Sequence, residues 1–210
     1  YTVMVSASED EKYFEGTGSV RVTRGTFSTS VDTSEYIGQI GQPVDVTVKA
    51  ESNEDGKPLA GKVIRIVAGE ENWTMNKVSF EPLETIEATT GPDGTAKITY
   101  TPKKAGSLVF KTHAVDELKN EIESSCYLYV EGAGVPARPG GKLMVTLDKP
   151  KYDIGQTAKV LIQTDKPGGF GLLTVEADDV LYQRVINLTQ TVTIASMAVE
   201  KSFGPNAQVS

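Results

Sequence analysis

The chain has 210 residues, enough for one large domain or two modest ones, and its 20 glycines and 10 prolines suit a turn-rich protein. Its net charge of −7 comes without a basic patch, so neither nucleic acids nor anionic membrane surfaces are expected partners. One cysteine and one histidine exclude an internal disulfide and disfavour most metal sites and Cys/His catalysis. No apolar run approaches the roughly 20 residues that span a bilayer, so no transmembrane segment is expected.

Apolar residues recur mainly with a period of two, which predicts strands with one face in a core and the other in water. The clearest predicted strands cover residues 44–50, 64–68, 96–100, 108–114 and 122–130. Gly- and Pro-containing turn signals separate them, at 54–58, 91–94 and 103–106. No stretch has a convincing 3.6-residue period, and residues 115–122 are expected to form a tight polar loop rather than a helix.

An internal repeat relates two stretches of the chain. Asp32–Tyr36 (DTSEY) and Asp148–Tyr152 (DKPKY) are each followed by a Gly-Gln pair, beginning at Gly41 and Gly155, and then by an alternating strand. The Asp and Tyr positions are offset by 116 residues and the Gly-Gln pairs by 114, so the first copy carries two extra residues. We interpret each copy as the opening of a β-sandwich: a strand, an extended stretch with an inward tyrosine, a glycine turn and a core strand.

A weaker repeat concerns the start of the chain. The alternating residues Val3 to Ala7 parallel Phe110 to Ala114, which indicates the closing hairpin of a preceding domain. The predicted layout is a terminal hairpin of a preceding domain (1–27), a complete sandwich (28–131), a Gly/Pro-rich linker (132–141) and a second sandwich truncated at its C-terminus (142–210). An incomplete sandwich exposes unpaired edge strands, and the hairpin of a neighbouring molecule is a candidate to pair with them.

These residues resemble a known family. Leu147–Val160 (LDKPKYDIGQTAKV) resembles the opening of a macroglobulin domain in bacterial alpha-2-macroglobulin-like proteins. Gly171–Glu176 followed by Asp179–Leu188 resembles the pattern that marks the domain associated with the bait region in that family, and residues 28–131 resemble a macroglobulin domain. The resemblance implies an all-β fold of tandem immunoglobulin-like, macroglobulin-type sandwiches with mainly antiparallel strands.

The resemblance also implies a function. In this family a protease cuts an exposed bait segment, and the array of sandwiches then rearranges around the protease. The chain is expected to be a non-catalytic fragment of such an inhibitor, in which the joint at 132–141 lets neighbouring domains rotate. Target proteases, reached through the full-length parent, and neighbouring macroglobulin domains are the implied partners. A periplasmic or extracellular location, with a lipid anchor on the parent as one option, is also implied.

No residue is assigned a catalytic, cofactor-binding or metal-binding role, and the chain is not expected to be an enzyme. Cys126 stands before Tyr-Leu-Tyr, which departs from the family's Cys-x-x-Gln thioester motif, and it shares strand parity with Leu128, as a small core hydrophobe does. His113 is expected on a solvated sheet face. Asp178 and Asp179 are expected in a turn, since calcium-loop spacing is absent.

Three further residues have structural interpretations. We expect Glu176 to find a partner such as Arg184 across a hairpin, and Trp73 to plug the core near a loop. Arg138 is a trypsin-type target within the linker, but Pro139 follows it and discourages cleavage, so a plain linker is favoured over a bait.

Two other functions are compatible with a Gly-punctuated sandwich array. One is the immunoglobulin-like repeat of a bacterial cell-surface adhesin or stalk. The other is a carbohydrate-binding sandwich, which needs a stripe of exposed aromatic residues, for which Tyr127 and Tyr129 are the only clustered candidates.

Overall fold

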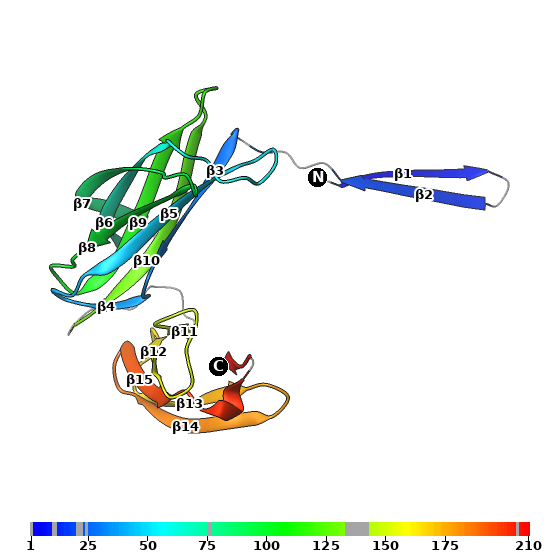
Figure 1. The fold of residues 1–210 in the computed structure, drawn as a ribbon. Helices are drawn as coiled ribbons and strands as arrows, with labels where there is room; N and C mark the ends of the chain where they lie inside the picture. Colours follow the sequence, from blue (N-terminus) through cyan, green and yellow to red (C-terminus); the bar gives the residue numbers. More distant parts are fainter. Residues whose placement is uncertain are drawn as a thin grey trace.

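A computed structural model describes residues 2–9, 12–19, 23, 25–74, 77–132, 143–204 and 206–210. Within these residues the strands form a hairpin that stands apart and two layered units (Figure 1). The only helical element in this part of the chain is a 3-10 turn at Lys201–Phe203. The expected all-β fold is therefore confirmed. None of the described helical residues forms a segment with the length and apolar character needed to cross a bilayer.

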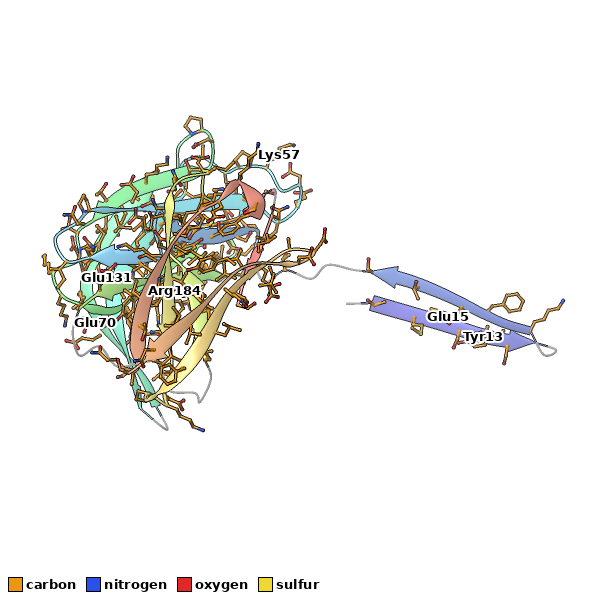
Figure 2. The ribbon with its side chains drawn as sticks, turned by 90° about the horizontal axis from the view of Figure 1, so that it is seen from below. Tyr13, Glu15, Lys57, Glu70, Glu131 and Arg184 are labelled. Carbon is orange, nitrogen blue, oxygen red and sulfur yellow. The ribbon has the colours of Figure 1, made fainter. Side chains whose placement is uncertain are left out.

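The hairpin consists of β1 (Thr2–Glu9) and β2 (Lys12–Ser19), which pair antiparallel over their full lengths. All of its described side chains are exposed, and Figure 2 shows Tyr13 and Glu15 far from Glu131 and Arg184 on the layered units. A two-stranded hairpin without a third strand or a packing partner is marginally stable at best in water.

The first sandwich packs two sheets face to face. One sheet has the order β3-β5-β8, and the other has the order β4-β10-β9-β6-β7. The bounds are β3 (Phe27–Thr33), β4 (Ile37–Gln39), β5 (Val44–Ser52), β6 (Val63–Thr74), β7 (Lys77–Thr89), β8 (Thr95–Tyr100), β9 (Gly106–Val115) and β10 (Glu121–Glu131). Only β4 and β10 pair in parallel among the described strands of this unit. Phe27 opens β3, the first strand of this unit.

The core of the first sandwich follows the period-two pattern of the sequence. Along β5 the side chains of Val44, Val46 and Val48 are buried, whereas Asp45 is exposed between them. The Phe110 ring on β9 meets the Tyr100 ring edge-on, with centroids 5.2 Å apart. Burying one face of each strand removes apolar area from water and fixes the register of each strand.

The second sandwich is smaller. One sheet has the order β11-β12-β15, and the other has the order β14-β13-β16. The bounds are β11 (Met144–Leu147), β12 (Thr157–Gln163), β13 (Gly169–Glu176), β14 (Val180–Leu188), β15 (Val192–Ala198) and β16 (Gln208–Val209). Its core joins Val160, Leu173, Val175 and Met197 with Phe203 from the 3-10 turn.

The internal repeat appears as the same local structure in both units. The Tyr36 hydroxyl donates to Asp32 at 3.3 Å, and the Tyr152 hydroxyl donates to Asp148 at 2.6 Å. The two Gly-Gln glycines both have left-handed φ values, +77° at Gly41 and +87° at Gly155, which a residue with a Cβ adopts only under strain. The two extra residues of the first copy fall between Tyr36 and Gly41, where the chain forms β4.

Candidate functional site

Among the residues that the structure describes, the chemically reactive side chains are not brought together. Cys126 is half-buried on β10 against the first core, and burial raises the pKa of its thiol to about 12, with the Asp32 charge adding to the shift. His113 Nδ1 lies 2.8 Å from a carboxylate oxygen of Glu123, its cross-strand partner, on a partly exposed face. Asp178 is exposed beside its neighbour in the turn before β14, and no group of three potential metal ligands occurs among the described residues.

The expected pairing of Glu176 with Arg184 is wrong. Glu176 instead accepts the hydroxyl of Thr174 at 2.6 Å, and Arg184 donates to the Ser196 carbonyl at 3.4 Å. A register shift after Val175 places Glu176 opposite Val180 and leaves Arg184 opposite Leu173. The two charged groups therefore lie at separate positions along the hairpin.

The tyrosines of β10 do not form an aromatic stripe. The Tyr127 side chain is 38% exposed and its hydroxyl donates to Glu71, whereas Tyr129 is only 6% exposed. The two residues share the outer face of β10, as residues two apart along a strand do, but Tyr129 is covered by Ile37 and Leu161. This arrangement gives the carbohydrate-binding alternative no flat platform at these residues.

Two of the sequence-based expectations lie outside the described residues. The linker at 132–141 is described only at Gly132, so neither Arg138 nor Pro139 can be placed. The backbone of Trp73 lies in β6 opposite Val78 rather than in a loop, but its side chain is outside the description.

The structure does assemble one site from distant parts of the sequence, the joint between the two sandwiches. We define the joint by β4, the end of β10 and the outer face of β12 and β15. The Tyr36 N–H donates to the Asp148 carbonyl at 2.7 Å, and the Tyr36 carbonyl accepts the Tyr129 N–H at 2.9 Å. One peptide segment of the first unit is thus hydrogen-bonded on both sides, to its own last strand and to the second unit.

An apolar cluster lies at the centre of the joint. Ile37 and Tyr129 of the first unit pack with Leu161 of the second, and these side chains are 2%, 6% and 4% exposed. Val192 and Ile194 on β15 pack around them. Burial at this level stabilises the docked arrangement by removing apolar surface from water, at about 25 cal/mol per Å².

Two ion pairs flank the cluster. Lys159 on β12 lies 2.7 Å from Glu131 at the end of β10, and Lys149 lies 3.7 Å from Glu35. All four side chains keep a quarter or more of their surface exposed, so each pair contributes about 0–1 kcal/mol. The apolar cluster therefore dominates the stability of the joint, and the charges favour one relative orientation.

The sequence reasoning did not identify the joint, although it contains two signals for it. The two extra residues of the first repeat copy lengthen the stretch between Tyr36 and Gly41, where β4 forms and supplies Ile37. Val160-Leu161-Ile162 is a continuous apolar run, whereas a strand buried on one face alternates. In the structure Val160 and Ile162 face the second core, and Leu161 faces the first sandwich.

Comparison with known proteins connects this geometry to a family. Residues 143–210, which form the second sandwich, match the family described as "Alpha-2-macroglobulin bait region domain". An alpha-2-macroglobulin of Ralstonia nicotianae is 27% identical over 181 residues, which is 86% of this chain and 11% of that protein. The chain thus spans about a tenth of the length of this curated relative. The resemblance drawn from Leu147–Val160 is confirmed, and the chain is alpha-2-macroglobulin-like.

Solved structures resemble the chain more loosely. Salmonella alpha-2-macroglobulin reacted with methylamine is 16% identical, with 96% of this chain and 14% of that chain covered and a TM-score of 0.39. Escherichia coli alpha-2-macroglobulin activated by porcine elastase is 13% identical, with coverages of 94% and 21% and a TM-score of 0.41. A tetra-tandem repeat from the extending region of a large adhesion protein is 16% identical, with coverages of 96% and 48% and a TM-score of 0.37. Likeness at this level does not distinguish one function from another.

Proposed function

We propose that this chain is a non-catalytic part of a bacterial alpha-2-macroglobulin-like inhibitor that traps proteases after cleavage of a bait segment. The match of residues 143–210 to the bait region domain carries the proposal. The half-buried, high-pKa thiol of Cys126 and the scattered positions of the other reactive side chains agree with a structural role. Target proteases would be its partners through the full-length protein, in the periplasm or outside the cell.

The same proposal includes the arrangement of domains. Residues 1–27 would form a hairpin of a preceding sandwich, 28–131 would form one macroglobulin-like sandwich, and 142–210 would belong to another. The unpartnered hairpin β1–β2 and the smaller second sandwich support this division.

Within such an inhibitor the joint would set the relative orientation of two sandwiches before the bait is cut. Its stability rests on a few apolar side chains, one main-chain hydrogen bond between the units and partly exposed ion pairs. A contact of this size can separate without unfolding either unit, because each unit keeps its own core. The joint would therefore hold the two units together in the uncut inhibitor and release them when the array rearranges.

The test uses the full-length protein that contains this chain, incubated with a panel of proteases. Trapping predicts that a bound protease still cleaves a small fluorogenic peptide but no longer cleaves a large protein substrate. Ile37→Asp should leave bait cleavage intact and impair this size discrimination. Ile40→Asp is the matched control, because Ile40 is 51% exposed three residues away and should behave like the unchanged protein.

Unimpaired digestion of the large substrate by every protease tested would refute the trapping function. If the same full-length protein instead adhered to surfaces and survived proteolysis without trapping, the adhesin or stalk alternative would replace it. Tandem sandwiches with a docked joint suit a stalk as well, so the protease assay is what separates the two functions.

A further inference from the structure

A pocket opens between the two sheets of the first sandwich, where the strands β7 and β8 at the edges of those sheets come together (Figure 1). Its volume is about 280 Å³. It is lined by Leu83 and Glu84 of β7, Tyr100 of β8, Lys103 and Lys104 of the turn that follows, and Leu108 of β9. Sites for drug-sized ligands begin at about 300 Å³, so this pocket suits a single side chain or a group of similar size.

The hydroxyl of Tyr100 is the unusual group of this pocket. Tyr100 is 5% exposed, and its ring packs edge-on against Phe110 in the core. The hydroxyl has no hydrogen-bond partner among the described residues, and it is not one of their fully enclosed polar atoms. Buried polar groups are normally hydrogen-bonded. An unpaired phenol that opens into a pocket therefore marks a position for a ligand atom.

The charges around this hydroxyl are predominantly negative. Burial raises the pKa of Tyr100, the Glu84 and Glu70 carboxylates raise it further, and the Lys104 ammonium opposes them. Lys104 is itself paired with Glu70, labelled in Figure 2, at 2.8 Å. Lys103, the other lysine of the lining, is exposed to solvent, which screens its charge. The floor of the pocket thus favours a cation.

Glu84 is the carboxylate that is available to such a cation. It has no ion-pair or hydrogen-bond partner among the described residues. It lies opposite Ala68 on β6, so its side chain belongs to the face of β7 that looks toward the other sheet. The Glu84 carboxylate and the Tyr100 hydroxyl together provide an ionic acceptor and a neutral acceptor at one pocket.

The walls of the pocket select a cation with an apolar stem. Leu108 is 1% exposed and Leu83 is 41% exposed, so apolar carbon lies beside the polar groups. An arginine side chain buries its alkyl stem along such surface and keeps its head group hydrogen-bonded. The planar guanidinium carries enough N–H donors to bind Glu84 through two of them and Tyr100 through a third. A lysine ammonium is a more strongly hydrated point charge and lacks this fork.

We propose that the pocket between β7 and β8 binds the alkylguanidinium group of an arginine, with Glu84 as its counter-ion and the Tyr100 hydroxyl as a hydrogen-bond acceptor. The Lys104–Glu70 pair borders the site and keeps the lysine engaged. All of these residues belong to the first sandwich. The proposal does not rest on the trapping function, so either can fail without the other.

The test is a titration of the 210-residue chain with the pentapeptide acetyl-Ala-Ala-Arg-Ala-Ala-amide, followed by NMR of the leucine methyl groups. A ligand held by one side chain should bind with a Kd of about 1 mM and shift the signals of Leu83 and Leu108. The same peptide with citrulline has the shape of the arginine side chain without its charge, and it should bind at least about tenfold more weakly. Free arginine is the second probe: if it binds as tightly as the peptide, the pocket serves a free guanidinium compound, and if it binds more weakly, the arginine of a polypeptide.

Variants of the chain assign the two polar contacts. Glu84→Gln should weaken binding of the arginine peptide by at least about tenfold, because it removes the counter-ion. Glu87→Gln is the matched control on the opposite face of the same strand, across from Arg65, and should change the Kd by less than about twofold.

Tyr100→Phe removes a single oxygen and keeps the ring that packs on Phe110. It should weaken binding about fivefold. The hydroxyl has no protein partner among the described residues, so this variant should unfold at nearly the same temperature as the unchanged chain. A purely structural role for the hydroxyl would give the reverse: a lower Tm and unchanged binding.

Equal affinities for the arginine and citrulline peptides would overturn the proposal, because the pocket would then not recognise charge. So would equal effects of Glu84→Gln and Glu87→Gln, or tighter binding of a matched glutamate peptide, which would show that the lysines dominate the pocket. No shift at Leu83 and Leu108 up to about 20 mM peptide would also overturn it and leave the Tyr100 hydroxyl to water.

Discussion

At the scale of single residues, Cys126 packs against the core of the first sandwich. Burial raises the pKa of its thiol to about 12 from an ordinary value of 9.0, and the thiolate is the species that reacts. We expect iodoacetamide at pH 8 to modify the folded chain about a thousandfold more slowly than the chain in urea, from the thiolate fraction alone. Equal rates, followed by mass spectrometry, would show that the thiol is accessible and activated.

Asp116 organises the loop between β9 and β10. One carboxylate oxygen accepts the N–H groups of Leu118 and Asn120 at 2.9 and 2.7 Å, and the other accepts the Thr26 N–H and the Asn120 side-chain amide, both at 2.9 Å. These hydrogen bonds, led by the Asn120 amide, lower the pKa of Asp116 from 3.8 to about 2, although burial opposes the shift. By accepting these hydrogen bonds, the Asp116 carboxylate holds the chain between β9 and β10 in a tight loop. A tight loop is what the sequence predicts for residues 115–122.

The sign of the pH dependence follows from this lowered pKa. Between pH 3.8 and about 2 the unfolded chain binds a proton at Asp116 that the folded chain does not, so the stability contributed by Asp116 is present above 3.8 and is lost as the pH falls through about 2. The difference in Tm between the unchanged chain and Asp116→Asn should therefore shrink over that interval. Asp55→Asn is the control, because the exposed Asp55–Lys57 pair should give a much smaller difference at neutral pH. A Tm difference for Asp116→Asn that is independent of pH would contradict the assignment.

At the scale of elements, the joint depends more on apolar packing than on charge. Leu161→Ala should lower the free energy that couples the two units by about 2 kcal/mol, the lower end for a buried leucine. Lys159→Met should cost less than about 1 kcal/mol, because its ion pair is partly exposed. Calorimetry of the 210-residue chain measures both, through the separation of the unfolding transitions of the two sandwiches.

Ile40→Ala serves as the control for that experiment, since an exposed side chain outside the joint should change stability by less than about 0.5 kcal/mol. If Lys159→Met uncoupled the sandwiches more than Leu161→Ala, charge and not packing would hold the joint.

The elements show where sequence reasoning succeeds and where it stops. Strands buried on one face, such as β5 and β8, are predicted because alternation records their environment. β7 was not predicted, because it is an edge strand with Pro82 and several glutamates, which protect an edge but break the apolar pattern. Ile37 and Leu161 were missed as joint residues. In a sequence, an apolar residue that docks on another unit cannot be distinguished from an apolar residue in a core.

The pairing of Glu176 with Arg184 failed for a different reason. Arg184 lies opposite Leu173, three residues along β13 from Glu176, so the two charged side chains are not cross-strand partners. Strand periodicity in a sequence does not give the cross-strand register of a hairpin, because that register depends on how the turn at 177–179 closes.

At the scale of the whole molecule, two copies of one sandwich plan are placed in series and joined by a strand that only the first copy has. The repeat that contains Asp32 and Asp148 occurs in both units. Only the first unit has the insertion that includes β4, and this segment contacts the second unit. The joint therefore holds the two sandwiches in a defined relative orientation.

The most direct measurement of that orientation is a distance distribution between the two sandwiches by double electron–electron resonance. Spin labels at Lys97→Cys and Val185→Cys, both exposed, are placed in a Cys126→Ser background at low protein concentration. A joint that fixes the two units predicts one narrow distribution, which Ile37→Asp should broaden and Ile40→Asp should not. A broad distribution in the chain with an unaltered joint would contradict the central claim.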